Sequence, residues 1–213
     1  LGGCGEMLQM FLASLPFEMT GAQQRVIKEI LRDVAMPHPM MRLVQGDVGS
    51  GKTVVAAAAA IQAVESDCQV AVMAPTELLA EQHFTNFECW CEGLGIRVGW
   101  LSGKVKGKVR TRLLGELKSG LVQVIIGTHA LFQDDVSFRR LGLVIIDEQH
   151  RFGVHQRLAL RDKGRERQQV PHQLIMTATP IPRTLAMSLY ADLDSSVIDE
   201  LPPGRTPVQT VVL

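Results

Sequence analysis

A short stretch near the start of the chain combines the residue types that hold phosphate groups. The segment GDVGSGKT follows the spacing G-x-x-x-x-G-K-[ST], with Gly46, Gly51, Lys52 and Thr53 at the fixed positions. Glycines let the backbone curl so that successive N–H groups point at a phosphate chain, and the next helix adds a partial positive charge. Lys52 is predicted to reach the β- and γ-phosphates, and the Thr53 hydroxyl to bind Mg²⁺.

The loop therefore predicts a site for a nucleoside triphosphate with Mg²⁺. The residues expected to form it are Gly46, Gly49, Ser50, Gly51, Lys52 and Thr53. The alternative is a glycine-rich turn that merely precedes a core helix. An alanine run follows the loop, from Ala56 to Ala60. Small side chains let such a helix pack closely against a sheet, and alanine has the highest helix propensity.

Two adjacent carboxylates form the second candidate feature. Asp147 and Glu148 follow the apolar run LGLVII. A carboxylate at the C-terminal end of a buried parallel strand lies in the crevice where such sheets bind ligands. Asp147 is predicted to hold the magnesium, and Glu148 to accept a proton from the water that attacks the γ-phosphate. The alternative is a solvated turn after a strand, and the phosphate loop upstream makes it the weaker one.

Alternating strands and helices are expected to position these groups. The predicted strands are MRLVQG, QVAVMA, RVGWLS, VQVIIG, LGLVIID, HQLIMTAT and SSVIDEL, and several are continuous apolar runs, as in strands buried on both faces. Predicted helices span residues 52–65, 77–90, 108–118, 154–162 and 182–190. This order predicts an α/β fold with a mostly parallel sheet and helices on both faces.

The overall composition is that of an ordinary globular protein. The chain has 213 residues, of which 46% are hydrophobic, and 22 basic residues balance 22 acidic ones. The balanced charge neither indicates nor excludes a nucleic-acid partner. No apolar stretch approaches the roughly 20 residues that span a bilayer, so we expect no membrane. The four cysteines lack metal or redox spacing, and we expect a cytoplasmic protein with reduced thiols.

Other segments narrow the class of nucleotide-binding protein. There is no LSGGQ and no NKxD, whereas APTELLAEQH, GTHAL, DEQH and TATPIPRTL each follow a predicted strand. This set resembles the first motor lobe of superfamily 2 helicases, a RecA-like P-loop NTPase domain. From residue 15 to 208 the wording resembles the RecG family of bacterial DNA helicases, with LPFEMTGAQQ, LSGKVKGKVR and LPPGRTPV as further matches. The transcription-repair coupling translocases resemble it less closely.

The resemblance implies a role for each matching position. It implies that Gln23 reads the adenine edge, for which an amide has both a donor and an acceptor. It implies DNA-backbone contacts and a coupling of hydrolysis to DNA movement. The implied DNA contacts are Thr76, Gly103, Lys104, Thr128 and His129, and the implied coupling residues are Gln149, His150, Thr177 and Thr179.

A basic segment supports a polyanionic partner without proving one. The segment GKVKGKVRTR carries Lys104, Lys106, Lys108, Arg110 and Arg112 with no acidic residue among them. Contacts of this kind position DNA without reading its sequence. A solvated helix start is an equally good interpretation of any single lysine. Trp90 and Trp100 favour packing over base stacking, and the arginines from Arg151 to Arg167 fit either a charged surface or a DNA-facing element.

The resemblance also predicts the domain organisation. Residues 1–15 are expected to be the tail of a connector from an N-terminal wedge domain, 16–200 the ATP-binding lobe, and 201–213 the start of a linker to a second motor lobe. The chain starts at Leu1 and ends in a strand-like segment, so we expect a longer protein. Without the second lobe, we expect little or no ATP hydrolysis.

Taken together, these features predict an ATP-binding lobe of a bacterial, nucleoid-associated helicase that remodels branched DNA such as stalled forks and Holliday junctions. Two alternatives remain open. One is a transcription-repair coupling translocase, which would need an upstream module that binds RNA polymerase. The other is a non-catalytic nucleotide switch, which a stop codon directly after Leu213 would favour.

Overall fold

A single parallel sheet organises the computed structural model, which describes residues 1, 3–148, 170–179 and 193–200. The sheet has seven strands in the order β3-β4-β2-β5-β6-β1-β7, and every pair of neighbours is parallel. The strands are β1 (Met41–Gly46), β2 (Gln69–Met73), β3 (Val98–Leu101), β4 (Val124–Gly127), β5 (Leu141–Asp147), β6 (His172–Thr177) and β7 (Asp194–Ile198). The predicted fold class is confirmed.

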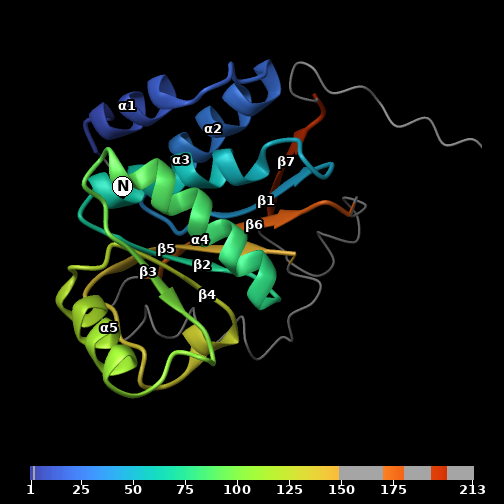
Figure 1. The fold of residues 1–213 in the computed structure, drawn as a ribbon. Coiled ribbons are helices and arrows are strands. Elements are labelled where there is room, and N and C mark those ends of the chain that lie inside the picture. The colour runs from blue at the N-terminus through green and yellow to red at the C-terminus, as the bar shows by residue number, and fades with distance from the viewer. Residues whose placement is uncertain (2, 149–169, 180–192, 201–213) are drawn as a thin grey trace, which may run out of the picture.

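Helices cover the sheet from both sides. Figure 1 shows α1, α2, α3 and α4 above the sheet and α5 below it. Their bounds are α1 (Glu6–Ser14), α2 (Gly21–Val34), α3 (Lys52–Glu65), α4 (Glu77–Glu92) and α5 (Gly107–Ser119), and a short 3-10 helix, η1 (His129–Phe132), follows β4.

The central strands bury side chains on both faces, as their continuous apolar runs predicted. In β2, Val70 and Val72 join the core under α3 and α4, whereas Ala71 and Met73 join the core around α5 and η1. In β5, Leu143 and Val144 divide in the same way. Because helices and apolar side chains cover both faces of the sheet, the polar side chains that come directly after the strands lie at the edge formed by the strand ends.

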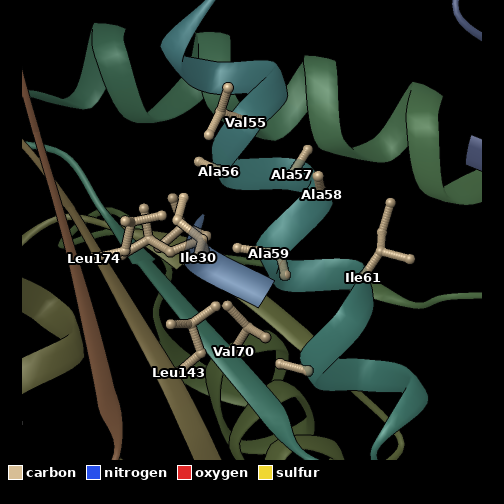
Figure 2. Close-up of a cluster of buried hydrophobic side chains, with 14 of the residues drawn as sticks. Ile30, Val55, Ala56, Ala57, Ala58, Ala59, Ile61, Val70, Leu143 and Leu174 are labelled. Atoms are coloured by element: carbon tan, nitrogen blue, oxygen red, sulfur yellow. The ribbon is translucent and has the colours of Figure 1, made fainter. Parts of the chain in front are cut away.

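Helix α3 lies in the middle of the apolar layer. Its residues from Val54 to Val64 are all buried. Figure 2 shows Ala56 and Ala59 on the side of α3 that faces Ile30 of α2 and the strand residues Val70, Leu143 and Leu174. Larger side chains would hold the helix away from the sheet, so the alanine run fixes where the phosphate loop meets the first turn of α3.

The first two helices were not among the predicted ones. Helix α2 begins with a capping box, in which Thr20 and Gln23 exchange side-chain to backbone hydrogen bonds. Helix α1 packs on the lobe through Phe11, whose ring meets the Trp90 ring edge-on at a centroid distance of 5.8 Å. The Glu65 carboxylate accepts N–H bonds near the start of α1. The proposed boundary between residues 15 and 16 stays a prediction.

The remaining predicted elements agree with the structure or fall outside it. The predicted strands at residues 41–46 and 141–147 and the predicted helix at 52–65 have the observed bounds. The other strands and the helices α4 and α5 differ by a few residues at their ends. The predicted helices at 154–162 and 182–190 lie outside the described residues. Both tryptophans pack on the core, Trp100 against Phe84, in accord with the packing interpretation.

Candidate functional site

Because all seven strands are parallel, the segments that follow them meet at one edge of the sheet. The strand order divides this edge into two halves. The phosphate loop and the carboxylates follow β1 and β5, with β6 between them. The candidate DNA residues follow β2, β3 and β4, which are neighbours in the other half. We call these the nucleotide half and the DNA-contact half of the edge.

The phosphate loop has the backbone conformation that its glycines allow. Gly49 and Gly51 have φ angles of 80° and 85°, in the left-handed region that favours glycine. Gly51 caps α3, and no side chain caps the N-terminus of that helix. The Ser50 side chain is 1% exposed, and its hydroxyl oxygen has no hydrogen-bond partner among the described residues. An anion bound at this loop would lie at the N-terminus of α3, whose partial positive charge favours it.

Gln23 ties helix α2 to the phosphate loop. Its Nε2 donates to the Ser50 carbonyl oxygen at 2.8 Å, and its Oε1 accepts the Thr20 N–H at 2.9 Å. A Cβ on Gly51 would collide with the Gln23 amide. Gln23 is 2% exposed. The structure therefore gives this side chain a loop-holding contact that the sequence analysis missed, and adenine recognition by Gln23 stays a prediction.

Lys52 lies across the loop, close to the carboxylates. Its ammonium group donates to the carbonyl oxygens of Gly46 and Asp47. Burial lowers the pKa of Lys52, while the charges of Asp147, Glu148 and Asp47 act in the opposite direction. The lysine and both carboxylates therefore share one electrostatic environment, as the sequence predicted.

Glu148 connects the end of β5 to the segment after β6. Its Oε1 accepts the Ala178 N–H at 3.0 Å, its Oε2 accepts the Thr177 hydroxyl at 3.4 Å, and its own N–H donates to the Met176 carbonyl. Its φ of 50° is unusual for a residue other than glycine and costs about 1–3 kcal/mol. A strained, well-held carboxylate next to Lys52 is typical of a functional position.

The predicted coupling residues fall into two groups. Thr177 contacts Glu148, and the Thr179 N–H donates to the Thr177 hydroxyl at 3.1 Å. Gln149 and His150 lie outside the described residues, as do Arg151 to Arg167. Within the described part of the chain, the carboxylate and the coupling segment thus touch directly through Glu148, a contact that no sequence pattern indicated.

The nucleotide half suits a magnesium ion that is bound together with phosphates. No cluster of three or more His, Cys, Asp or Glu ligands occurs in the described part of the chain. Mg²⁺ in nucleotide sites keeps several waters and uses only one or two protein oxygens besides the phosphates. The half-buried Thr53 hydroxyl and the Asp147 carboxylate are oxygen donors of this kind, so these residues fit the ion.

Asp147 has a partner that sequence reasoning missed. His83, from α4, places its Nε2 at 2.7 Å from Asp147 Oδ2. The histidine ends the segment APTELLAEQH, of which only Thr76 was assigned a role. It lies three residues after Ala80 and four before Phe87, a spacing that puts it on the buried side of α4.

The DNA-contact half brings together two of its three predicted segments. Thr76 is exposed and caps α4, where its hydroxyl accepts the Leu79 N–H. Lys104, next to the exposed Gly103, forms an ion pair with Glu77, directly after Thr76. His129 is exposed, whereas Thr128 is 3% exposed and its hydroxyl has no partner within the described ranges. Contact of Thr128 with DNA would require a rearrangement.

The basic segment is less basic in space than in sequence. Arg110 forms an ion pair with Asp135, and Arg112 pairs with Glu116 one turn along α5. The two exposed lysines Lys106 and Lys108 have no ion pair among the described residues. Acidic residues from outside the segment balance the charges of the two arginines. The prediction of a basic edge therefore applies best to Lys106 and Lys108.

The chain is similar to known proteins over most of its length. A family model described as DEAD/DEAH box helicase matches residues 20–188. The chain is 66% identical over 208 residues to the ATP-dependent DNA helicase RecG of Pasteurella multocida, and 68% identical over 202 residues to that of Escherichia coli K12. The alignments cover 98% and 95% of this chain but 30% and 29% of the relatives, so the chain spans about a third of their length.

Solved structures agree with this similarity. A structure of RecG bound to a three-way DNA junction matches with a TM-score of 0.85 and 44% identity, and the match covers 98% of this chain and 27% of that one. The DUF1998 helicase MrfA matches with a TM-score of 0.71 and 17% identity, over 93% of this chain and 32% of that one, which supports the fold alone. Within the described residues, no helix is long and apolar enough to cross a membrane.

Proposed function

We propose that this chain, which belongs to the DEAD/DEAH box helicase family, is the ATP-binding lobe of an ATP-dependent DNA helicase that remodels branched DNA. The chain is similar to RecG proteins and to a structure of RecG bound to a three-way DNA junction. This similarity supports branched DNA as the substrate class. The observation that carries the proposal is the grouping of Lys52, Asp147 and Glu148 beside an open phosphate loop.

Each group in the nucleotide half has a part in this proposal. The loop N–H groups and Lys52 bind the triphosphate, and Ser50, a residue of the same loop, contributes its hydroxyl. Thr53 and Asp147 hold Mg²⁺, which when bound neutralises charge on the phosphates. Glu148 orients and deprotonates the attacking water. Its contact with Thr177 and Ala178 transmits the state of this carboxylate to the segment that follows β6.

The DNA-contact half supplies phosphate contacts that position the nucleic acid without reading bases. Thr76, Gly103, Lys104 and His129 are the proposed contacts, and Lys104 would exchange Glu77 for a phosphate. We propose that a wedge domain and a second motor lobe of the same protein grip the branch and complete the ATP site. The proposed protein acts in the bacterial cytoplasm, at the nucleoid.

Hydrolysis by the 213-residue chain alone is expected to be slow. In related nucleotide hydrolases an arginine from a second element contributes roughly 10³–10⁵ in rate. We propose that the second motor lobe supplies this arginine. Strong DNA-stimulated turnover by the chain alone would contradict this expectation.

Calorimetry tests the nucleotide site first. The chain is titrated with Mg²⁺-ATP, and Lys52→Ala serves as the binding-deficient variant, with a DNA fork present or absent. We expect binding that the substitution abolishes. For the substrate class, the complete reading frame that contains this chain is assayed on forks, three-way junctions and linear duplex. Equal turnover on all three would refute branched-DNA specificity, and binding without any turnover would favour the nucleotide switch.

A further inference from the structure

The carboxylate of Asp147 is held by a side chain from the other half of the edge. His83 projects from α4, which follows β2, whereas Asp147 ends β5. Their side chains meet at 2.7 Å, with the imidazole Nε2–H donating to carboxylate Oδ2. Strands β2 and β5 are neighbours in the sheet, and their boundary is where the DNA-contact half meets the nucleotide half.

The position of His83 on its helix argues against simple packing. The other buried residues of α4 are Ala80, Phe87 and Cys91, so the buried face is otherwise apolar. His83 itself is 6% exposed. Burying a polar ring costs free energy unless it finds a partner, and an apolar side chain would fill the same space without that cost. The bond to Asp147 is the partner that the structure provides.

The bond also restricts what Asp147 can do. With Oδ2 engaged by the imidazole, Oδ1 is the oxygen left for a metal ion or for its bound water. The Asp147 side chain is 13% exposed, so few water molecules can orient it. Groups that hydrogen-bond to a metal-binding carboxylate typically change metal affinity or activity by 10- to 100-fold when they are replaced.

We propose that His83 is a positioning residue, which orients the Asp147 carboxylate for Mg²⁺ and anchors α4 to the nucleotide half. The proposal rests on the proposed function, because it takes Asp147 as a magnesium ligand. Thr76, a proposed DNA contact, caps the start of α4, and His83 contacts the Asp147 carboxylate two turns later. One rigid helix therefore joins the two halves of the edge.

Magnesium titration of nucleotide binding tests the proposal without measuring turnover. The protein encoded by the complete reading frame that contains this chain is mixed with a fluorescent ATP analogue at a fixed concentration. Binding of the analogue is then measured as the Mg²⁺ concentration is varied. His83→Leu removes the donor and keeps the volume, whereas His83→Gln places an amide N–H near the position of Nε2. We expect the Mg²⁺ requirement to rise 10- to 100-fold in the leucine variant and less than about 3-fold in the glutamine variant.

Two further variants separate the possible failures. Cys91→Ala loosens the same buried face of α4 without touching Asp147, and we expect an unchanged Mg²⁺ requirement. An equal rise in Cys91→Ala and His83→Leu would reduce His83 to a packing residue and overturn the proposal. Asp147→Asn removes the charge of the proposed ligand itself, and we expect it to raise the Mg²⁺ requirement as well.

The outcomes for Asp147 decide which proposal fails. If Asp147→Asn raises the Mg²⁺ requirement and His83→Leu leaves it unchanged, the positioning role of His83 is wrong while the magnesium site stands. If Asp147→Asn itself has no effect, the magnesium assignment in the proposed function is wrong, and the positioning role falls with it. Thermal unfolding without nucleotide identifies any variant that fails to fold, and His83→Gln then carries the comparison with wild type.

Discussion

Replacing Gly51 by alanine should act through one identifiable neighbour, the Gln23 amide. Gly51 has a φ of 85°, and its missing Cβ leaves the space that this amide occupies. A left-handed alanine costs about 1–2 kcal/mol. Displacing the amide breaks its bond to the Ser50 carbonyl and leaves buried groups unpaired, at a cost of about 1–3 kcal/mol. The free energy of unfolding should therefore fall by about 2–5 kcal/mol.

A double-mutant cycle separates the two costs. In a Gln23→Ala background the collision is absent, so Gly51→Ala should cost only the backbone strain of about 1–2 kcal/mol. The expected interaction between the two sites is about 1–3 kcal/mol, in the direction that makes the double variant more stable than the sum of the single ones. Urea unfolding without nucleotide measures each free energy by linear extrapolation.

A matched glycine provides the control for this cycle. Gly115 is exposed in α5, and a Cβ there would have no neighbour within 4 Å. Gly115→Ala should raise the free energy of unfolding by about 0.5–1 kcal/mol, because alanine loses less backbone entropy in a helix. If the free-energy changes of Gly51→Ala and Gln23→Ala add to that of the double variant within about 0.5 kcal/mol, the contact between the loop and α2 does not contribute to stability.

Three further outcomes follow from charged and titratable groups. Because burial lowers the pKa of Lys52 and phosphate binding needs its ammonium form, calorimetry should show nucleotide affinity falling as pH rises through a value below 10.5; constant affinity to pH 10.5 would contradict this. Glu148→Gln should keep nucleotide binding and slow ATP turnover by about 10²–10⁴ in the complete reading frame, so unchanged turnover would exclude a general base. Burial, helped by the charges of the N-terminus and His38, lowers the pKa of His172 from 6.5 to about 4, and its Nδ1 accepts the Met40 N–H. The unfolded chain therefore binds more protons than the folded chain between pH 6.5 and 4, and the free energy of unfolding should fall by about 1–3 kcal/mol as the pH drops through this range. Urea unfolding of His172→Asn should show a smaller dependence of this free energy on pH.

Three side chains of the nucleotide half contact different elements of the fold. Lys52 touches loop carbonyls, Glu148 touches the segment after β6, and Asp147 touches α4. A triphosphate that draws Lys52 away from those carbonyls would alter the charge around both carboxylates. Each contact leads to a different element, so the site sits where several parts of the fold meet.

Local sequence signals were sufficient for the strands and for the phosphate loop. The apolar runs predicted the bounds of β1 and β5 correctly. A strand that is buried on both faces needs apolar side chains at nearly every position, so the run ends where the strand ends. The loop followed from glycine spacing before an alanine-rich helix. Helix α2 was missed although its capping box was in the sequence, because Gln23 had been interpreted only through the adenine-reading role that the resemblance implied.

The tertiary structure alone decided which side chains meet across the sheet. The sequence by itself determined that the groups after the strands would share one edge, since parallel strands bring their carboxyl ends together. It did not determine that β6 would lie between β1 and β5, or that His83 of α4 would reach Asp147 at the end of β5. The bonds from His83 to Asp147 and from Glu148 to Thr177 join residues 64 and 29 positions apart. Contacts at such separations depend on strand order and helix packing, which local spacing does not encode.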